Sequence, residues 1–319
     1  MARLVTLTLN PALDMSSEAA AVRAGGKLRC AAPRLDPGGG GVNVSRALRL
    51  LGGDSLAAVA VGGPSGAAFR ALAEAEGLDA LWLDAPGDTR RSLAVTDAGT
   101  GEQYRFVFPG EPWDADALDA ALGGLEAALR PGDVVALSGS QPPGAPADLP
   151  LILAERLAAR DVRLAVDTSG PALDAAAAGG GAPLALLRMD RGEAGGLLGV
   201  ATPDAAQAEA LARSLAARGA AEVAVVTLAG EGAIAATAAE AWRVTPPVVQ
   251  VVSAVGAGDS FLAGFLGVMA AGGPLREALA RAMAAAASAV TTPATALCDR
   301  ASAEALYRRM SLTPLESST

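Results

Sequence analysis

The segment Val134-Val135-Ala136-Leu137-Ser138 is apolar up to its last residue, and after an Ala- and Leu-rich stretch over residues 146–159 a second such run follows at 163–167. Short runs with apolar centres are typical of parallel strands that are buried on both faces. The stretch between them has Pro146 at its start, as helices often do. Further strands are expected at 59–62 and 222–227, and further helices at 114–129 and 203–218. This alternation predicts a three-layer α/β/α domain with right-handed crossovers.

Two segments depart from this alternation. Residues 27–37 are extended in character, and residues 90–108 hold two alternating stretches around a Gly99-Thr100-Gly101 turn, which is a hairpin signal. They predict a small β-sheet lid, formed by about 15–37 and 89–108, on a single domain that spans residues 1–319. The polar end of the chain, 311–319, is expected to fray.

The composition excludes several classes of site. The chain has 319 residues, no histidine, one lysine (Lys27) and two cysteines. A Ser-His-Asp triad, a histidine base and histidine metal ligands are therefore excluded, and so is a Walker-type phosphate loop, which needs Gly-Lys-Ser/Thr. Proton transfer falls to a carboxylate, or less readily to a tyrosine, a cysteine or Lys27. Two thiols make neither a disulfide framework nor a zinc pattern, so we expect a cytoplasmic protein.

The charge balance bears on the partners. A net charge of −9 disfavours nucleic acid and anionic membranes, and we expect neither as a partner. The most apolar run, Phe261 to Leu275, is shorter than a membrane span and is expected to be a core helix and its end. An anionic substrate would need a local cluster of basic side chains.

The strongest chemical motif is Val255-Gly256-Ala257-Gly258-Asp259-Ser260, followed by apolar residues at helical spacing. A glycine loop that opens a helix directs several N–H groups, and the positive end of the helix dipole, toward one point that suits phosphate oxygens. Asp259 beside that point could accept the proton of an attacking hydroxyl while the amides hold the developing charge. The alternative is an ordinary aspartate N-cap after a glycine turn.

A second motif places four glycines, residues 38–41, before another helical stretch, with Asn43 in its first turn. Exposed backbone and an amide side chain suit a sugar hydroxyl, although a flexible loop would have the same composition. Asp14 follows the first strand, where ligands bind in open α/β sheets, although an aspartate there is more often part of a turn.

Taken together, these segments resemble the ribokinase-like, phosphofructokinase B family of sugar kinases over nearly the whole chain. The matching segments are 6–14, 26–30, 38–47, 101–107, 138–144, 166–170 and 256–259. Two of them, 26–30 and 101–107, are most similar to the bacterial B-type 6-phosphofructokinases within this family.

The resemblance implies a role for each matching residue. Asp259 would be the base, with Gly256, Ala257 and Gly258 as the anion hole. Sugar hydroxyls would be bound by Asp14, Gly39, Gly40, Asn43 and Ser140, and the substrate's phosphate by Arg90 and Arg105 on the lid. Arginine forks suit phosphate. ATP would be the phosphoryl donor, Lys27 would have a regulatory role, and two lids would join in a homodimer.

The nucleotide side departs from the family pattern. Arg188, Asp190 and Glu193 stand where the family usually has Lys-Pro-Asn-x-x-Glu, so Glu193 and Asp190 would hold Mg²⁺ through water while Asp190 adds a charge. The ATP-binding set implied by the family is Arg188, Asp190, Thr227, Ala229, Gly232 and Gly258. Ala229 replaces a common glycine, and its methyl group could crowd the phosphates. The stretch 292–296 is less polar than usual, which bears on the adenine pocket and on a K⁺ site.

The expected reaction is ATP-dependent phosphorylation of fructose 6-phosphate to fructose 1,6-bisphosphate, a step of glycolysis. Fructose 1-phosphate and tagatose 6-phosphate remain alternative substrates. A different class, a sugar-phosphate-binding regulator without catalysis, is motivated by the changes at Arg188, Asp190 and Ala229. A ribose or nucleoside kinase is disfavoured by the lid arginines.

Overall fold

A computed structural model describes residues 2–293 and 296–316. The strands are β1 (Leu4–Thr8), β2 (Ala12–Ala19), β3 (Arg34–Gly38), β4 (Leu56–Val61), β5 (Ala80–Asp84), β6 (Arg90–Asp97), β7 (Gln103–Val107), β8 (Val134–Ser138), β9 (Arg163–Asp167), β10 (Leu186–Asp190), β11 (Ala224–Thr227), β12 (Ala233–Ala236), β13 (Ala241–Thr245) and β14 (Ser311–Leu315). The helices are α1 (Gly40–Leu50), α2 (Gly63–Ala75), α3 (Ala115–Ala128), α4 (Leu149–Ala158), α5 (Pro171–Ala178), α6 (Arg191–Leu198), α7 (Ala205–Ala217), the 3₁₀ turn η1 (Ala229–Glu231), α8 (Ala257–Ala270), α9 (Leu275–Ala289) and α10 (Arg300–Tyr307).

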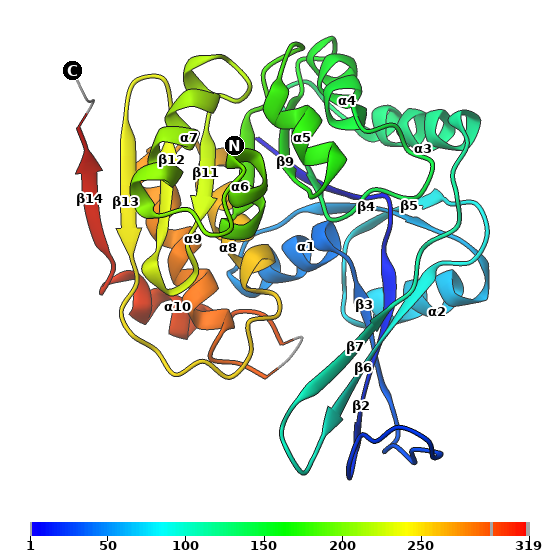
Figure 1. The fold of residues 1–319 in the computed structure, drawn as a ribbon. Coiled ribbons are helices and arrows are strands. Elements are labelled where there is room, and N and C mark those ends of the chain that lie inside the picture. Colours follow the sequence, from blue (N-terminus) through cyan, green and yellow to red (C-terminus); the bar gives the residue numbers. More distant parts are fainter. Residues whose placement is uncertain (1, 294–295, 317–319) are drawn as a thin grey trace.

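The large sheet runs through the whole body (Figure 1). In the described residues its order is β14-β13-β12-β11-β10-β9-β8-β1-β4-β5. The pairs from β5 to β11 are parallel, and those from β11 to β14 are antiparallel. The carboxyl ends of the parallel strands therefore share one edge, where open α/β sheets bind ligands.

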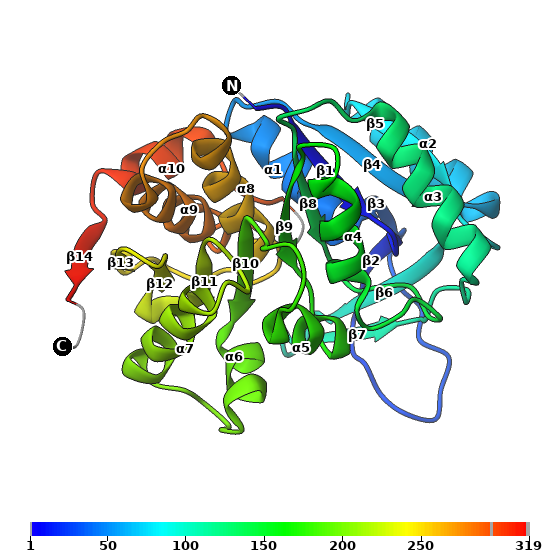
Figure 2. The same cartoon turned by 90° about the horizontal axis from the view of Figure 1, so that it is seen from above.

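Helices cover both faces of this sheet (Figure 2). Along β8, Val135 and Leu137 join a core with α3, α4, α5 and α7, whereas Val134 and Ala136 join a second core with α1, α8 and α9. Every residue of β8 is buried, which explains its continuous apolar sequence. The three-layer α/β/α prediction is confirmed.

A second, small sheet has the order β3-β2-β6-β7 and projects from the body in Figure 1. We call these four strands the small sheet. β2 pairs in parallel with β6 from Ala12↔Arg90 to Ala19↔Asp97, and β6 pairs antiparallel with β7, the predicted hairpin. Asp97 caps the hairpin turn, accepting from the amides of Gly99 and Thr100.

One local prediction is wrong. Instead of fraying, residues 311–315 form β14, which pairs antiparallel with β13 at the edge of the large sheet. Leu312 and Leu315 pack against the two cores, and β14 is held further by its backbone pairing with β13. Residues 317–319 lie outside the described part. Among the described residues, no helix is long and apolar enough to cross a membrane.

Candidate active site

Asp259 lies in the first turn of α8, but it does not cap the helix. The N-cap position is Gly256, with φ 77°, and no side chain caps the helix there. A glycine is needed at this position because positive φ disfavours other residues and because a Cβ would lie 2.5 Å from Leu297 Cδ2. First-turn amides have no acceptor within their own helix. The N-cap alternative is therefore wrong for Asp259, and its carboxylate is available for other contacts.

The carboxylate of Asp259 is contacted by the second glycine motif. Asn43 Nδ2, on α1, donates to Asp259 Oδ2 at 3.0 Å. Arg46 Nη1 donates to Asn43 Oδ1 at 3.2 Å, and Arg46 is itself held by two bonds to Glu76, at 2.6 and 3.0 Å. Two motifs that are 216 residues apart in sequence thus meet where α1 and α8 begin.

The surroundings of Asp259 favour its protonated form. Burial raises the pKa of Asp259 from 3.8 to about 7, and the negative charge of Asp167 adds to this increase. The hydrogen bond from Asn43 and the charges of Arg188 and Arg46 act in the opposite direction. A carboxylate with a pKa near neutrality suits a general base, because it is deprotonated in part of the population and still binds a proton well.

The glycines before α1 allow the chain to pass very close to two strand ends. A Cβ on Gly40 would lie 2.5 Å from Ser138 Oγ and 2.6 Å from Gly139 N. Gly39 has φ 125°, and a Cβ there would lie 2.8 Å from Thr8 Cγ2. Side chains are therefore excluded, and the N-terminus of α1 meets the carboxyl ends of β1 and β8.

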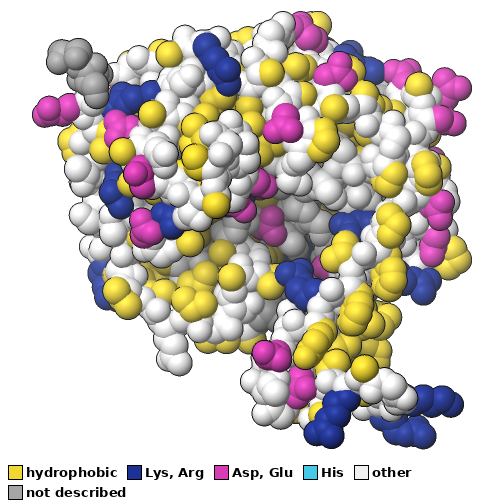
Figure 3. Space-filling view, in the orientation of Figure 1, with side chains coloured by type: hydrophobic (Ala, Val, Ile, Leu, Met, Phe, Trp, Pro, Cys, Tyr) yellow, Lys and Arg dark blue, Asp and Glu magenta, His cyan; other side chains and the backbone are white. Residues whose placement is uncertain are grey.

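The residues predicted to bind the sugar phosphate surround the start of the small sheet. Arg90 Nε donates to the Asn10 carbonyl at 3.1 Å, and Asn10 Nδ2 donates to Ser140 Oγ at 3.2 Å. Burial raises the pKa of Asp14, against the lowering effects of a hydrogen bond from Ser92 and the charges of Arg90 and Arg105. Figure 3 shows a hollow where the small sheet meets the body, with acidic side chains in its depth and basic ones at its margin.

Near Asp259, Arg188 forms a second buried network. Its Nη1 donates to Asp167 Oδ1 at 3.0 Å, and its Nη2 donates to Thr227 Oγ1 at 2.9 Å. A Cβ on Gly258 would lie 3.3 Å from both terminal nitrogens, so the guanidinium lies directly beneath the glycine loop. The Nε of Arg188 is buried and has no acceptor among the described residues.

The two predicted magnesium ligands form a capping box at the start of α6. Glu193 N donates to Asp190 Oδ1 at 2.9 Å, and Asp190 N donates to Glu193 Oε2 at 2.7 Å. Burial raises the pKa of Glu193, and the charges of Asp190 and Asp167 add to this. A cation would relieve this repulsion, so the carboxylates fit Mg²⁺. In the described part of the chain, no three acidic or cysteine side chains form a complete metal site, so substrate phosphates and water would have to supply the other ligands.

The loop after β11 has a strained residue. Ala229 has φ 52°, a left-handed conformation that favours glycine. Gly232 is also required, because a Cβ there would lie 1.8 Å from the Val244 carbonyl oxygen. For the stretch 292–296, residues 294 and 295 lie outside the described part, so the expectations about adenine and K⁺ remain open there.

A family model described as pfkB family carbohydrate kinase matches residues 8–301. The chain belongs to the pfkB family of carbohydrate kinases. It is 36% identical over 305 residues to ATP-dependent 6-phosphofructokinase isozyme 2 of Mycobacterium tuberculosis H37Rv, covering 96% of this chain and 89% of that protein. It is 35% identical over 276 residues to 1-phosphofructokinase of Rhodobacter capsulatus, covering 86% of each.

The fold agrees with this assignment. The crystal structure of Escherichia coli phosphofructokinase-2 in complex with fructose-6-phosphate superposes with a TM-score of 0.89 at 32% identity, covering 97% of this chain and 99% of that one. This pfkB protein is therefore a phosphotransferase that acts on an alcohol group of a sugar, with ATP as co-substrate. The resemblance inferred from its motifs is confirmed.

Sequence reasoning missed several residues of this pfkB site. Asp167 and Arg46 act on Asp259 electrostatically, and Asn10 links Arg90 to Ser140. Of these residues, Asp167 could have been found from the sequence, because it ends an apolar strand at the edge of the sheet where ligands bind. Lys27 lies exposed in the segment between β2 and β3 and makes no ion pair among the described residues, so its regulatory role stays a prediction.

Proposed function

We propose that this kinase transfers the γ-phosphoryl group of ATP to fructose 6-phosphate, with Asp259 as the general base. The observation that carries the proposal is the 3.0 Å hydrogen bond between Asn43 and Asp259. It brings the sugar-type glycine motif and the phosphate-type glycine loop to one place, on a carboxylate whose pKa is about 7.

In the proposed reaction, the sugar hydroxyl lies against Asp259, which takes its proton as the hydroxyl oxygen attacks the γ-phosphorus. The amides of the predicted anion-hole residues Gly256, Ala257 and Gly258 would donate to the oxygens on which charge develops. The buried Nε of Arg188 is a further donor that a phosphate oxygen could accept from. Asp190 and Glu193 would hold Mg²⁺ through water, and the ion would neutralise phosphate charge.

The choice of sugar phosphate rests on the small sheet. One carboxylate and two cations lie close together there, on Asp14, Arg90 and Arg105. A carboxylate can accept hydrogen bonds from sugar hydroxyls, and two guanidinium groups can bind a phosphate. Relatives named 6-phosphofructokinase match 96–98% of this chain, and the R. capsulatus 1-phosphofructokinase matches 86%. Fructose 1-phosphate is thus the second candidate.

The test is ADP release with a panel of fructose 6-phosphate, fructose 1-phosphate, tagatose 6-phosphate, fructose and ribose. We expect the highest kcat/KM with fructose 6-phosphate, and a kcat lower by about 10²–10⁴ in Asp259→Asn. A higher kcat/KM with an unphosphorylated sugar would overturn the assigned role of the two arginines. Fructose 6-phosphate that binds tightly without any turnover would instead favour the regulator alternative.

We also propose that two chains associate through the small sheet. Exposed apolar side chains gather there: Leu35, Tyr104, Phe106, Val107 and Phe108. Figure 3 shows apolar side chains along this projecting part of the molecule. E. coli phosphofructokinase-2 is described in a tetrameric inhibited form, so a dimer could be a unit of larger assemblies.

A matched pair of valines tests the interface. Val107 on β7 is 66% exposed and Val248, before α8, is 97% exposed. Val107→Lys should give a monomer in light scattering, and Val248→Lys should keep the wild-type mass. A wild-type monomer, or identical masses for both variants, would contradict the proposed interface.

Two finer expectations also belong to this proposal. A K⁺ requirement is suggested by an E. coli phosphofructokinase-2 structure in complex with potassium. A cytoplasmic location fits free thiols at exposed Cys30 and buried Cys298.

A further inference from the structure

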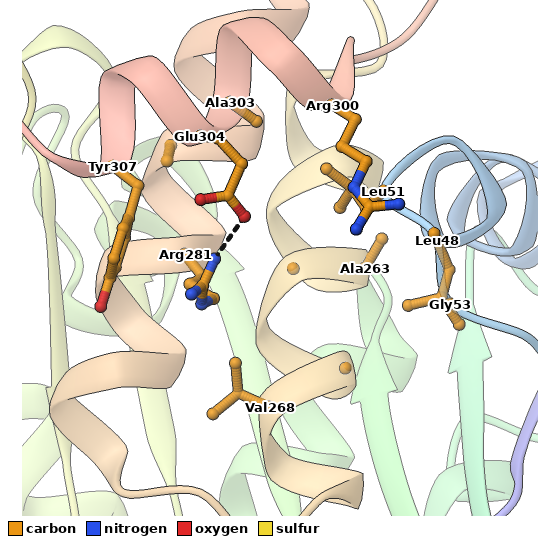
Figure 4. A pocket seen from close by; sticks show the side chains of 14 residues that line it. Leu48, Leu51, Gly53, Ala263, Val268, Arg281, Arg300, Ala303, Glu304 and Tyr307 are labelled. Carbon is orange, nitrogen blue, oxygen red and sulfur yellow. Dashed lines mark hydrogen bonds and ion pairs between the residues drawn. The ribbon is translucent and has the colours of Figure 1, made fainter.

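A cavity of about 250 Å³ lies between the end of α1 and helices α8, α9 and α10 (Figure 4). It borders the same α1–α8 seam that carries the Asn43–Asp259 contact at its other end. Ala263, one helical turn beyond Asp259, lines the cavity, and so does Leu48, the fifth residue after Asn43. None of the roles assigned above uses this space.

Small residues create the hollow. A Cβ on Gly264 would lie 2.9 Å from both Ala282 Cα and the Arg281 carbonyl oxygen, so α8 and α9 touch through their backbones. Further along α8, a Cβ on Gly267 would lie 3.3 Å from Leu48 Cδ1. Helices that pack this closely leave little side-chain volume beside them, and the floor of the cavity is apolar.

Two arginines line the cavity, and they differ in whether they have an ion-pair partner. Arg281 is neutralised by Glu304 at 2.8 Å and Glu277 at 3.1 Å, and it lies 4.2 Å from the centre of the Tyr307 ring. Arg300 enters from α10 toward Leu51 and Ala263 in Figure 4. Within the described residues, no carboxylate lies within ion-pair distance of Arg300. One unpaired cation thus faces an apolar floor.

The charge around Arg300 and the volume of the cavity decide which kind of ligand would fit. Arg300 is the first residue of α10, where the positive end of the helix dipole does not stabilise a cation. Its own helix therefore does not stabilise the charge of the guanidinium group. Arg300 is an exposed residue, so its guanidinium lies at the rim of the cavity, where it adds a local positive charge to a chain whose net charge is −9. The volume is below the roughly 300–1,000 Å³ of sites for drug-sized ligands, so the occupant must be small.

We propose that this cavity binds a small organic anion, with one carboxylate or phosphate group on Arg300 and a short apolar body against Ala263, Gly267 and Leu48. The occupant would contact both α1 and α8. Its binding would therefore change the geometry of the hydrogen bond between Asn43 and Asp259, and with it kcat. This second part rests on the proposed role of Asp259, whereas the binding site itself does not.

The test uses butyl phosphate and butyrate as probes, with butanol as the uncharged control. Titration calorimetry with fructose 6-phosphate present would compare wild type, Arg300→Gln and Arg276→Gln. Arg276 is an exposed arginine on α9 that does not line the cavity, so its variant makes the same charge change elsewhere. We expect affinity for one or both anions to fall about tenfold or more in Arg300→Gln only, the loss of one charge-assisted contact.

The kinetic part is read separately. At saturating substrates, the bound anion should change kcat at least about twofold in wild type and Arg276→Gln, but not in Arg300→Gln. Equal anion binding by wild type and Arg300→Gln, or none by wild type, would overturn the site. Binding that depends on Arg300 but leaves kcat unchanged would overturn the coupling. Turnover of fructose 6-phosphate without any anion reports on the proposed function independently.

Discussion

The sugar side and the nucleotide side of the candidate site use charge in different ways. On the sugar side, Arg105 is exposed and Arg90, within the described part of the chain, hydrogen-bonds only to a backbone carbonyl, so both guanidinium groups keep donors for a ligand. On the nucleotide side, Arg188 is already engaged by Asp167 and Thr227. The sequence predicts that the family pattern is kept on the sugar side and altered on the nucleotide side.

The contrast lies in how each arginine is held within the folded chain. Arg188 lies on β10, between β9 and β11. Its forked guanidinium group makes one hydrogen bond to a residue at the end of each of these two neighbouring strands. A lysine carries a single compact charge and cannot reproduce that fork. The arginine on the predicted nucleotide side is therefore fixed by neighbouring side chains, whereas Arg105 on the predicted sugar side is exposed.

The largest expected effect tests this difference directly. Arg188→Met would leave the Asp167 carboxylate buried without its partner, which should lower the free energy of unfolding by about 3–5 kcal/mol. Arg105→Met, at an exposed position, should change it by less than about 0.5 kcal/mol while raising the KM for the sugar phosphate. Urea unfolding measures the first quantity, and steady-state kinetics measures the second. Equal unfolding midpoints for the two variants would contradict the claim that Arg188 stabilises the fold and Arg105 does not.

The second effect is a pair of opposite pH shifts. Asp259 must be deprotonated to accept a proton, so kcat should fall as the pH drops below its pKa of about 7. Asp167 raises that pKa, so Asp167→Asn should move this acid limb to lower pH. The hydrogen bond from Asn43 lowers it, so Asn43→Ala should move the limb to higher pH.

Each shift should be about one pH unit or less. Profiles of kcat against pH measure both, with Asp119→Asn as a control, because Asp119 pairs with Arg156 on the outer surface. Limbs that move in the same direction in both variants would show that these two neighbours do not set the pKa of Asp259.

The smallest effect concerns the strained loop on the nucleotide side. Ala229→Gly removes a Cβ from a residue at φ 52°, a relief of about 1 kcal/mol that the greater entropy of unfolded glycine partly offsets. We expect a slightly higher unfolding midpoint and a KM for ATP lowered a few-fold. Ala239→Gly, at an exposed position without positive φ, should instead be neutral or destabilising. The same outcome for both variants would contradict strain at residue 229.

Much of the fold could be predicted because its strands are buried on both faces. Residues 134–138 and 163–167 match β8 and β9 because continuous apolar runs end sharply at polar residues. The helix expected at 146–159 begins at Leu149, after a loop rich in proline and glycine. β14 was missed because it is short and contains a proline, and its backbone pairing at the sheet edge is not visible in the sequence.

The site could be predicted in part, for a similar reason. Gly39 and Gly256 have positive φ, and Gly40 and Gly258 have close neighbours that a Cβ would contact, so both loops need glycines that can be seen in the sequence. The contacts of Arg46 with Glu76, and of Arg188 with Asp167, join elements that meet only in the folded chain. No local pattern announces such pairs, because either partner alone reads as an ordinary charged residue.

The central claim is that Asp259 removes the proton from the incoming hydroxyl as the phosphoryl group is transferred. The most direct measurement is kcat against pH for wild type and Asp259→Asn, with fructose 6-phosphate and ATP saturating. We predict a wild-type limb near pH 7, and a variant that lacks the limb, is slower by about 10²–10⁴ and binds the sugar phosphate with unchanged Kd. A variant within about tenfold of wild type, with the same limb, would contradict the claim.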